Sequence, residues 1–282
     1  TVTSYDDDAL LNEWGGYTKK YHAVREVLLA FQGIPAEPLP APPALQNIGP
    51  VALTQQYSFL HNATKIGKRH RSVMTRSMEY YGQNFGFILY HHDLKGPYEA
   101  SKLFIDGLAD RAYVYVNGQL RGMVYRNDKK KFVSIEALPD GGSLDILVEA
   151  MGRVNYGPEL HDRKGVRQIR LNNQVLFNWD VYTLPLDNID ALDYSGSEDF
   201  PAFLKGRFTT NSQADCFVHL KGFTKGYVFI NGFNLGRYWK IGPQKSLYVP
   251  GTILKQENEI IVLELEGCRA NEVEITDYHD IG

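Results

Sequence analysis

Hydrophobic and polar residues alternate with a period of two along most of this chain, the pattern of strands that bury one face. From Gly49 onward, short alternating runs are separated by Gly and Asp residues that are typical of turns. A first series of strands is predicted at residues 85–90, 102–105, 112–116, 132–135 and 144–149. A second series is predicted at residues 202–208, 216–220, 226–230, 246–249 and 259–265. The chain is therefore predicted to be mostly β.

Near the start of the chain the pattern becomes helical, and a helix is predicted at residues 18–31. Thr18 can cap its start, and Gly33 can end it. The apolar residues of this helix share one face at three- and four-residue spacing: Tyr21, Val24, Val27, Leu28 and Phe31. A short β-prone stretch at residues 1–5 precedes it. One strand and one helix cannot bury a core alone, so this pair is predicted to be the last unit of a larger α/β domain.

The two series of strands repeat one another. Residues 110–118 read DRAYVYVNG and residues 224–232 read TKGYVFING, an offset of 114 residues. The apolar triplet at 146–148 matches that at 260–262 with the same offset. A repeat of this length indicates two copies of one domain, each a sandwich or jelly roll. Each Asn-Gly pair predicts a tight hairpin turn, because Asn and Gly adopt positive φ at low cost.

A proline-rich segment separates the helix from the first sandwich. Residues 34–43 contain five prolines, which can neither pair in a sheet nor continue a helix. An extended, stiff linker is predicted at residues 33–48. The resulting layout is a strand–helix remnant at 1–32, a first sandwich at 49–195 and a second at 196–282. Residues 49–80 are the part of the first sandwich that could pair with the second.

Composition and charge remove several classes of function. The 282 residues carry a net charge of −3, which gives no electrostatic reason to expect nucleic acid or an anionic membrane as a partner. The sequence contains no apolar run of about 18 residues, so no membrane-spanning helix is expected. Cys216 and Cys268 are predicted to be unpaired thiols. Polar residues at the start of the chain favour a bacterial cytoplasmic protein over a secreted one.

No metal or cofactor is predicted. The acidic run Asp6-Asp7-Asp8 lacks the spacing of a calcium loop. His91 and His92 are neighbours at the end of a strand, where their side chains point to opposite faces and cannot easily share a ligand. The sequence shows no glycine-rich phosphate loop and no zinc-ligand spacing.

Two segments are dense in residue types that bind sugars, at 151–157 and at 233–243. Aromatic faces pack on the C–H face of a pyranose, while Arg and Asn bond its hydroxyls. The alternative is that each segment is a loop that bonds the backbone of a neighbouring domain. The alternative is favoured for 233–243, and both interpretations stay open for 151–157.

The same segments carry a resemblance. GFNLGRYW at 232–239, with LYVP at 247–250, resembles the C-terminal domain of the family 35 glycoside hydrolases, the β-galactosidases. MGRVNYG at 151–157 is similar to the middle domain of that family, and TSYD at 3–6 to the end of its catalytic barrel. The resemblance implies a (β/α)₈ barrel followed by two galactose-binding-like sandwiches. It also implies retaining hydrolysis by two Glu residues of the barrel, so no catalytic residue is expected in this chain.

The resemblance also implies sugar-binding positions. Tyr5 and Asp7 would lie at the rim of the galactose pocket, and Asp7 stands where the family has a galactose-contacting Tyr. Tyr156 is expected on the aglycone side, in a loop flanked by Gly152 and Gly157 and fixed by Arg153 and Asn155 through bonds to backbone carbonyls. The expected partners are galactosides or other glycans and the barrel domain, with the oligomeric state left open. The alternative is a stand-alone carbohydrate-binding module.

Overall fold

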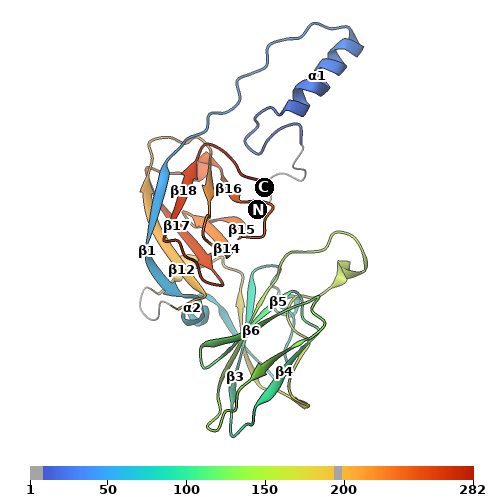
Figure 1. The fold of residues 1–282 in the computed structure, drawn as a ribbon, viewed down its shortest axis with the longest axis vertical. Helices are drawn as coiled ribbons and strands as arrows, with labels where there is room; N and C mark the ends of the chain where they lie inside the picture. Colours follow the sequence, from blue (N-terminus) through green and yellow to red (C-terminus); the bar gives the residue numbers. More distant parts are fainter. Residues whose placement is uncertain (1–8, 194–198) are drawn as a thin grey trace. The chain divides into compact units, whose positions relative to one another are not determined.

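The computed structural model describes residues 9–193 and 199–282. It divides the chain into two compact units (Figure 1). One unit, the split unit, comprises Thr1–Phe59 and Ser195–Gly282. The other, the inserted unit, is Leu60–Tyr194, which interrupts the split unit in sequence. Both are built from β-sheets, which confirms the predicted mostly-β fold class.

The inserted unit is a sandwich of a six-stranded and a four-stranded sheet. The larger sheet has the order β2-β11-β3-β8-β5-β6 and the smaller β10-β9-β4-β7. Apolar residues of both sheets share one core, among them Tyr90, Leu103, Ile146 and Trp179. Its strands are β2 (Lys68–Ser72), β3 (Phe87–Leu94), β4 (Ser101–Asp106), β5 (Arg111–Val116), β6 (Gln119–Tyr125), β7 (Phe132–Ile135), β8 (Gly142–Glu149), β9 (Gln168–Leu171), β10 (Gln174–Val175) and β11 (Trp179–Leu184). Its short helices are α2 (Phe59–Ile66), which begins at the boundary, and the 3₁₀ turns η1 (Met78–Tyr81), η2 (Pro158–His161) and η3 (Ile189–Ala191).

The split unit closes its sandwich with a strand from before the insertion. Residues Gly49 to Ala52 of β1 (Gly49–Ser58) pair with β18, and residues Leu53 to Ser58 pair with β12. An irregularity between Leu53 and Gln55 lets β1 leave one layer and join the other. The strand order is β15-β14-β17-β12-β1-β18-β13-β16. The remaining elements are β12 (Ala202–Thr209), β13 (Cys216–His219), β14 (Lys225–Ile230), β15 (Phe233–Trp239), β16 (Ser246–Val249), η4 (Gly251–Ile253), β17 (Glu257–Glu264) and β18 (Glu272–Thr276).

The predicted helix is present as α1 (Lys19–Gln32). The Thr18 hydroxyl accepts a hydrogen bond from the Tyr21 amide at 3.2 Å, and Gly33 ends the helix with φ of 65°. None of its residues is buried, and the side chain of Phe31 is 88% exposed. None of the helices in the described residues combines the length and the apolarity needed to cross a membrane.

The internal repeat is visible in the pairing of the strands. β3 and β5–β6 of the inserted unit correspond to β12 and β14–β15 of the split unit at the predicted offset of 114 residues. The offset fails at the next strand. Asn117 pairs with Ser143 and Asn231 with Glu259, so β8 and β17 correspond at an offset of 116. The predicted match of 146–148 with 260–262 is wrong by two residues, because the connection between β15 and β17 is longer.

Both copies bury a cation at the open end of the repeated hairpin. Arg111 pairs across the hairpin with Tyr125, and its guanidinium carbon lies 4.6 Å from the ring centroid. Lys225 pairs with Trp239 in the same way, with its ammonium 4.8 Å from that ring. Arg111 is 1% exposed and Lys225 is fully buried. A cation over an aromatic face gains more where water is excluded, so this pair stabilises both hairpins.

The segment 233–243 is not the loop that was predicted. Residues Phe233 to Trp239 form the edge strand β15, paired with β14. A register shift between Val228 and Phe229 accommodates the glycine-containing strand, and the Asn234 side chain caps the Gly236 amide at 2.8 Å. The aromatic residues of this segment therefore belong to a sheet.

The two Asn-Gly turns occupy equivalent positions in the repeat, but their asparagine side chains make different hydrogen bonds. Asn117 and Asn231 have φ of 50° and 51°. Each side chain accepts a bond from the amide of the facing strand, but Asn231 also donates to the Ile253 carbonyl and to the side chain of Asn258, at 2.9 and 2.8 Å. Replacing Asn231 with Ala is therefore expected to cost about 1–3 kcal/mol more free energy of unfolding than replacing Asn117 with Ala. Native-state hydrogen exchange of the β14 and β5 amides measures each unit separately, and equal losses in the two variants would contradict the expectation.

Candidate functional site

Of the three residues predicted to contact sugar, one lies in the described structure. Tyr5 and Asp7 fall outside the described residues, so their place at the pocket rim stays a prediction. Tyr156 lies between β8 and β9 of the inserted unit, and its side chain is 88% exposed. The segment that carries it, residues 151–164, is called the Tyr156 loop below.

Two carboxylates close the base of the Tyr156 loop, and each bonds both of its ends. Asp110 accepts a hydrogen bond from the Met151 amide at 2.8 Å and from the Lys164 ammonium at 2.9 and 3.0 Å. Glu79 accepts from the Arg153 guanidinium at 2.5 Å and from the Lys164 amide at 3.0 and 3.1 Å. The ends of the loop are thereby held together on the sandwich.

Arg153 and Asn155 were both predicted to bond backbone carbonyls, and within the described residues Arg153 does so whereas the exposed Asn155 does not. The Arg153 guanidinium donates to the backbone carbonyl of Asn84 at 2.8 and 3.2 Å. Gly152 and Gly157 have φ of 119° and 105°, where a side chain would be strained. The loop is thus shaped by its glycines and fixed at its base, while Tyr156 is left exposed.

The charges around Asp110 neutralise one another. Arg126 bonds Asp110 at 2.7 Å and also contacts Asp162, and Lys164 lies 3.2 Å from Asp162. Lys164 is 1% exposed, and these two carboxylates offset the cost of burying its ammonium group. Burial raises the pKa of Asp162, but hydrogen bonds from Arg126 and Lys164 outweigh it and hold the pKa below its ordinary value. Paired carboxylates of this kind are suited to anchoring a loop, whereas a general acid needs a raised pKa.

What the loop presents outward is the tyrosine. A tyrosine ring offers an apolar face and a hydroxyl that donates and accepts. Because the ring stands on a fixed loop, it can contact a ligand without first being ordered. The arrangement is therefore suited to binding rather than to proton transfer.

The residue types that could bind a metal ion do not form a cluster in the described residues. In the parts of the chain that the structure describes, no group of three or more His, Cys, Asp or Glu side chains could hold a metal ion. His91 and His92 point to opposite faces of β3, as predicted: His91 bonds Asp145 at 2.8 Å, and His92 packs against the ring of Trp179. Sequence reasoning missed Glu79, Asp110 and Lys164, because they meet only in the folded sandwich.

Comparison with known proteins agrees with this fold. Residues 75–185 match the model of the β-galactosidase first all-β domain, and residues 201–259 match that of the β-galactosidase galactose-binding domain. The chain is 37% identical to a mouse β-galactosidase and to a bovine one, over 96% and 94% of its own length. It is 34% identical to β-galactosidase 8 of Oryza sativa subsp. japonica over 94% of its length.

The tandem sandwiches and both domain models define the all-β accessory domains of a glycosidase. The chain belongs to the β-galactosidase family. It spans 46%, 45% and 47% of the length of the mouse, bovine and rice relatives. The expectation of a bacterial cytoplasmic protein is wrong, since these relatives are eukaryotic. That expectation relied on polar residues at the start of the chain, which indicate exposure to water and do not identify the organism.

The anchor of the loop predicts a dependence on pH. Burial raises the pKa of Glu79, but bonds from backbone amides, that of Lys164 first, and from Arg153 lower it below the ordinary value of about 4.5. Because the pKa is lower in the folded chain, the unfolded chain binds more protons in acid. The stabilisation by Glu79 should therefore be complete above its ordinary pKa and fall as the pH falls through its folded pKa.

Urea denaturation of the chain between about pH 3 and pH 7 measures this effect as the free energy of unfolding of the inserted unit. Glu79→Gln should lower stability at neutral pH and flatten its decline in acid. The control Glu159→Gln changes an exposed carboxylate of the same loop. A Glu79→Gln variant whose decline in acid matches that of the wild type would refute the assignment.

Proposed function

We propose that this chain is the accessory β-sandwich region of a retaining β-galactosidase that hydrolyses terminal β-D-galactosyl residues. In this proposal the Tyr156 loop shapes the aglycone side of the catalytic pocket, and Tyr5 and Asp7 lie at its rim. The supporting observation is the identity of 34–37% over at least 94% of the chain to proteins named β-galactosidase, together with domain models of that family on both units.

The charge pattern of the described residues supports a catalytic centre elsewhere. Glu79, Asp110 and Asp162 are each bonded to a cation. Glu264 has a pKa raised by burial, but it is fully buried and accepts bonds from the Thr224 amide at 2.8 Å and the Tyr238 hydroxyl at 2.9 Å. It cannot reach a substrate. In the proposal, the pair of carboxylates that glycoside hydrolysis requires belongs to a barrel domain outside this chain.

Helix α1 supports the same assignment. Its apolar face is exposed, with Val27 at 69%, Leu28 at 52% and Phe31 at 88%. An amphipathic helix gains stability chiefly by burying such a face against another element. In the proposal, residues 1–32 are the last strand and helix of the barrel, and the barrel covers this face.

The chain by itself is expected not to hydrolyse an aryl β-galactoside, because positioned acid and nucleophile groups provide most of the acceleration. The measurement compares the purified 282-residue chain with a mock preparation. The whole protein, assayed in parallel, should be active. Turnover by the chain alone would show that its own residues carry the reaction. A whole protein that binds galactose without turnover would instead favour a carbohydrate-binding module, a function to which the galactose-binding model over 201–259 also points.

In the whole protein, Tyr156→Ala is expected to lower kcat/KM for a galactosyl disaccharide by roughly 1–3 kcal/mol, the scale of one lost pocket contact. The loss on an aryl galactoside should differ, because its leaving group presents a different surface to the ring. Tyr156→Phe separates the contribution of the hydroxyl from that of the ring. Equal losses on both substrates that follow a fall in melting temperature would show a structural role and refute the placement.

A further inference from the structure

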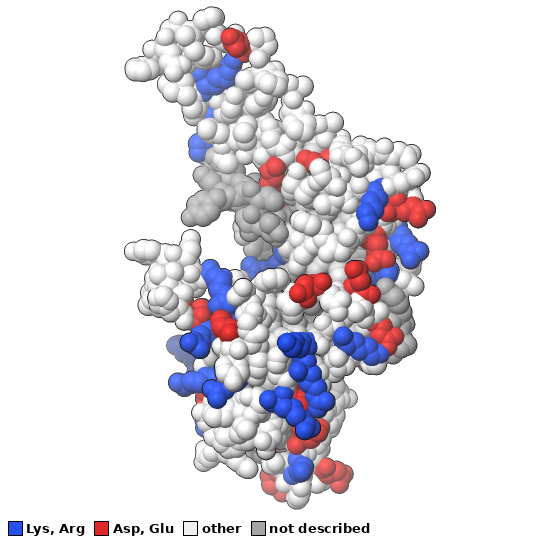
Figure 2. All heavy atoms as spheres, turned by 180° about the vertical axis from the view of Figure 1, so that it is seen from behind, with Lys and Arg blue, Asp and Glu red and all other residues white. Residues whose placement is uncertain are grey.

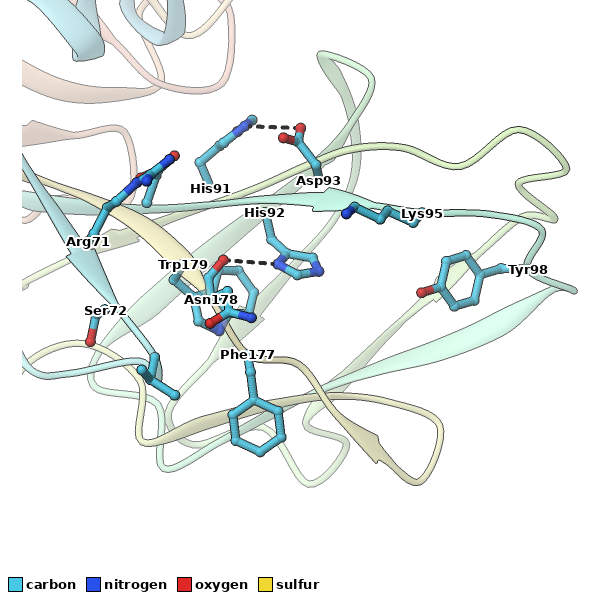
Figure 3. A pocket seen from close by; sticks show the side chains of 12 residues that line it. Arg71, Ser72, His91, His92, Asp93, Lys95, Tyr98, Phe177, Asn178 and Trp179 are labelled. Atoms are coloured by element: carbon cyan, nitrogen blue, oxygen red, sulfur yellow. Dashed lines mark hydrogen bonds and ion pairs between the residues drawn. The ribbon is translucent and has the colours of Figure 1, made fainter.

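A groove in the inserted unit is unconnected with the Tyr156 loop. It is lined by the end of β3, the turn before β11 and the edge strand β2 (Figure 3). Its volume is about 690 Å³, within the range of small-molecule sites. We call it the His92 groove, after the residue at its centre.

On one side of the groove, the charged side chains are paired with neighbouring residues of the protein. Asp180 bonds Arg69 at 2.7 Å and lies 3.5 Å from Arg71. His91 bonds Asp145 at 2.8 Å and lies 3.4 Å from Asp93. These pairs leave little unbalanced charge on this side of the groove, so its lining does not call for a charged ligand.

On the other side of the groove, three polar side chains have no hydrogen-bond or ion-pair partner in the described part of the chain. Figure 3 shows Lys95 and Tyr98 reaching into the groove beside His92, with Phe177 below. Within the described residues, neither the Lys95 ammonium, the Tyr98 hydroxyl nor the Asn178 side-chain amide has a hydrogen-bond partner. These groups are therefore available to the hydroxyls of a ligand.

His92 supplies an acceptor among these donors. Its Nδ1 lies 3.4 Å from the Asn178 carbonyl oxygen, which can only accept, so Nδ1 carries the hydrogen. Burial lowers the pKa of His92, which keeps the ring neutral and leaves a lone pair on Nε2. The ring packs on Trp179 with centroids 5.1 Å apart, which fixes its direction.

Phe177 presents an apolar ring at the mouth of the groove, and the backbone around it is fixed. Its side chain is 45% exposed. The residue before it, Leu176, is buried and accepts a bond from the Trp179 indole at 3.0 Å. The residue after it, Asn178, has φ of 65° and bonds the Val73 carbonyl at 2.9 Å. The exposure of Phe177 is therefore imposed by a rigid turn.

We propose that the His92 groove binds a neutral pyranose of a glycan, as a second carbohydrate site distinct from the Tyr156 loop. The Phe177 ring packs on the C–H face of the sugar, His92 Nε2 accepts from a hydroxyl, and Tyr98 and Lys95 donate to others. One side of the groove carries charged side chains that are already paired. The other side carries unpaired polar groups and an exposed aromatic ring. This lining fits an uncharged, hydroxyl-rich ligand. Binding at this site involves no catalysis, so the proposal does not depend on whether the chain is part of an active enzyme.

The test titrates the 282-residue chain with lactose and follows backbone amide and indole signals by NMR. Lactose should shift the Trp179 indole and the Phe177 amide in a saturable way. Phe177→Ala and His92→Ala should each weaken binding roughly tenfold, the scale of one pocket contact. The matched control is Phe85→Ala, which removes a phenylalanine that is 57% exposed and does not line the groove, and it should leave binding unchanged.

Three results would overturn the proposal. The first is the absence of a saturable shift at Trp179. The second is equal weakening by Phe177→Ala and Phe85→Ala. The third is tighter binding of galacturonate or inorganic phosphate than of lactose, which would show an anion site around Lys95. Because Phe177 lies on the surface, its variant should fold, and an unchanged amide spectrum away from the groove verifies this. The readout is binding by the chain alone, so it is independent of the hydrolysis assay.

Discussion

The ion pair of Asp110 with Lys164 is the constraint on which the Tyr156 loop depends. Both side chains are almost fully buried, and removing two charges from water costs several kcal/mol for each ion. Asp110 offsets that cost by also accepting bonds from Arg126 and from the Met151 amide. Removal of one partner would leave the other with part of its compensation, Arg126 for Asp110 or Asp162 for Lys164, so the cost should stay below the roughly 3–5 kcal/mol of a fully unpaired buried charge. The position of the loop is therefore fixed by electrostatics as well as by packing.

The internal repeat shows which of these features belong to the fold and which belong to one copy. The buried cation and its aromatic partner occur in both copies, as Arg111 with Tyr125 and Lys225 with Trp239. The acid does not. At the offset of 114 residues, the position of Asp110 is occupied by Thr224, which bonds Glu264 and the Gly267 carbonyl. The shared pair stabilises a hairpin, whereas the carboxylate of Asp110, which anchors the Tyr156 loop, is replaced by the Thr224 hydroxyl in the second copy.

Local patterns predicted the elements, and distant pairing decided the rest. Alternation located strands such as β5 and β14, and the caps Thr18 and Gly33 bounded α1 correctly. The two-residue change of offset at β17 was missed, because a match of three apolar residues cannot fix a register. The sequence left open that residues 49–80 pair with the second sandwich, but the path of β1 through both layers could not be predicted, since its partner β12 follows the whole inserted unit. The His92 groove joins residues near 71, 92 and 177, which share no spacing that a motif could reveal.

The two proposed sites follow one electrostatic rule. In each, most charged side chains are paired within the protein, although the Lys95 ammonium of the groove is not paired with any described residue. An exposed aromatic ring faces outward in both sites, Tyr156 in the loop and Phe177 in the groove. Figure 2 shows Lys and Arg lying among Asp and Glu on the visible face, and the net charge is only −3. Long-range attraction would thus contribute little to capture of a neutral glycan, and each contact would be weak. Two weak sites on one sandwich gain affinity when a ligand carries several sugars, because the second contact then forms within the complex.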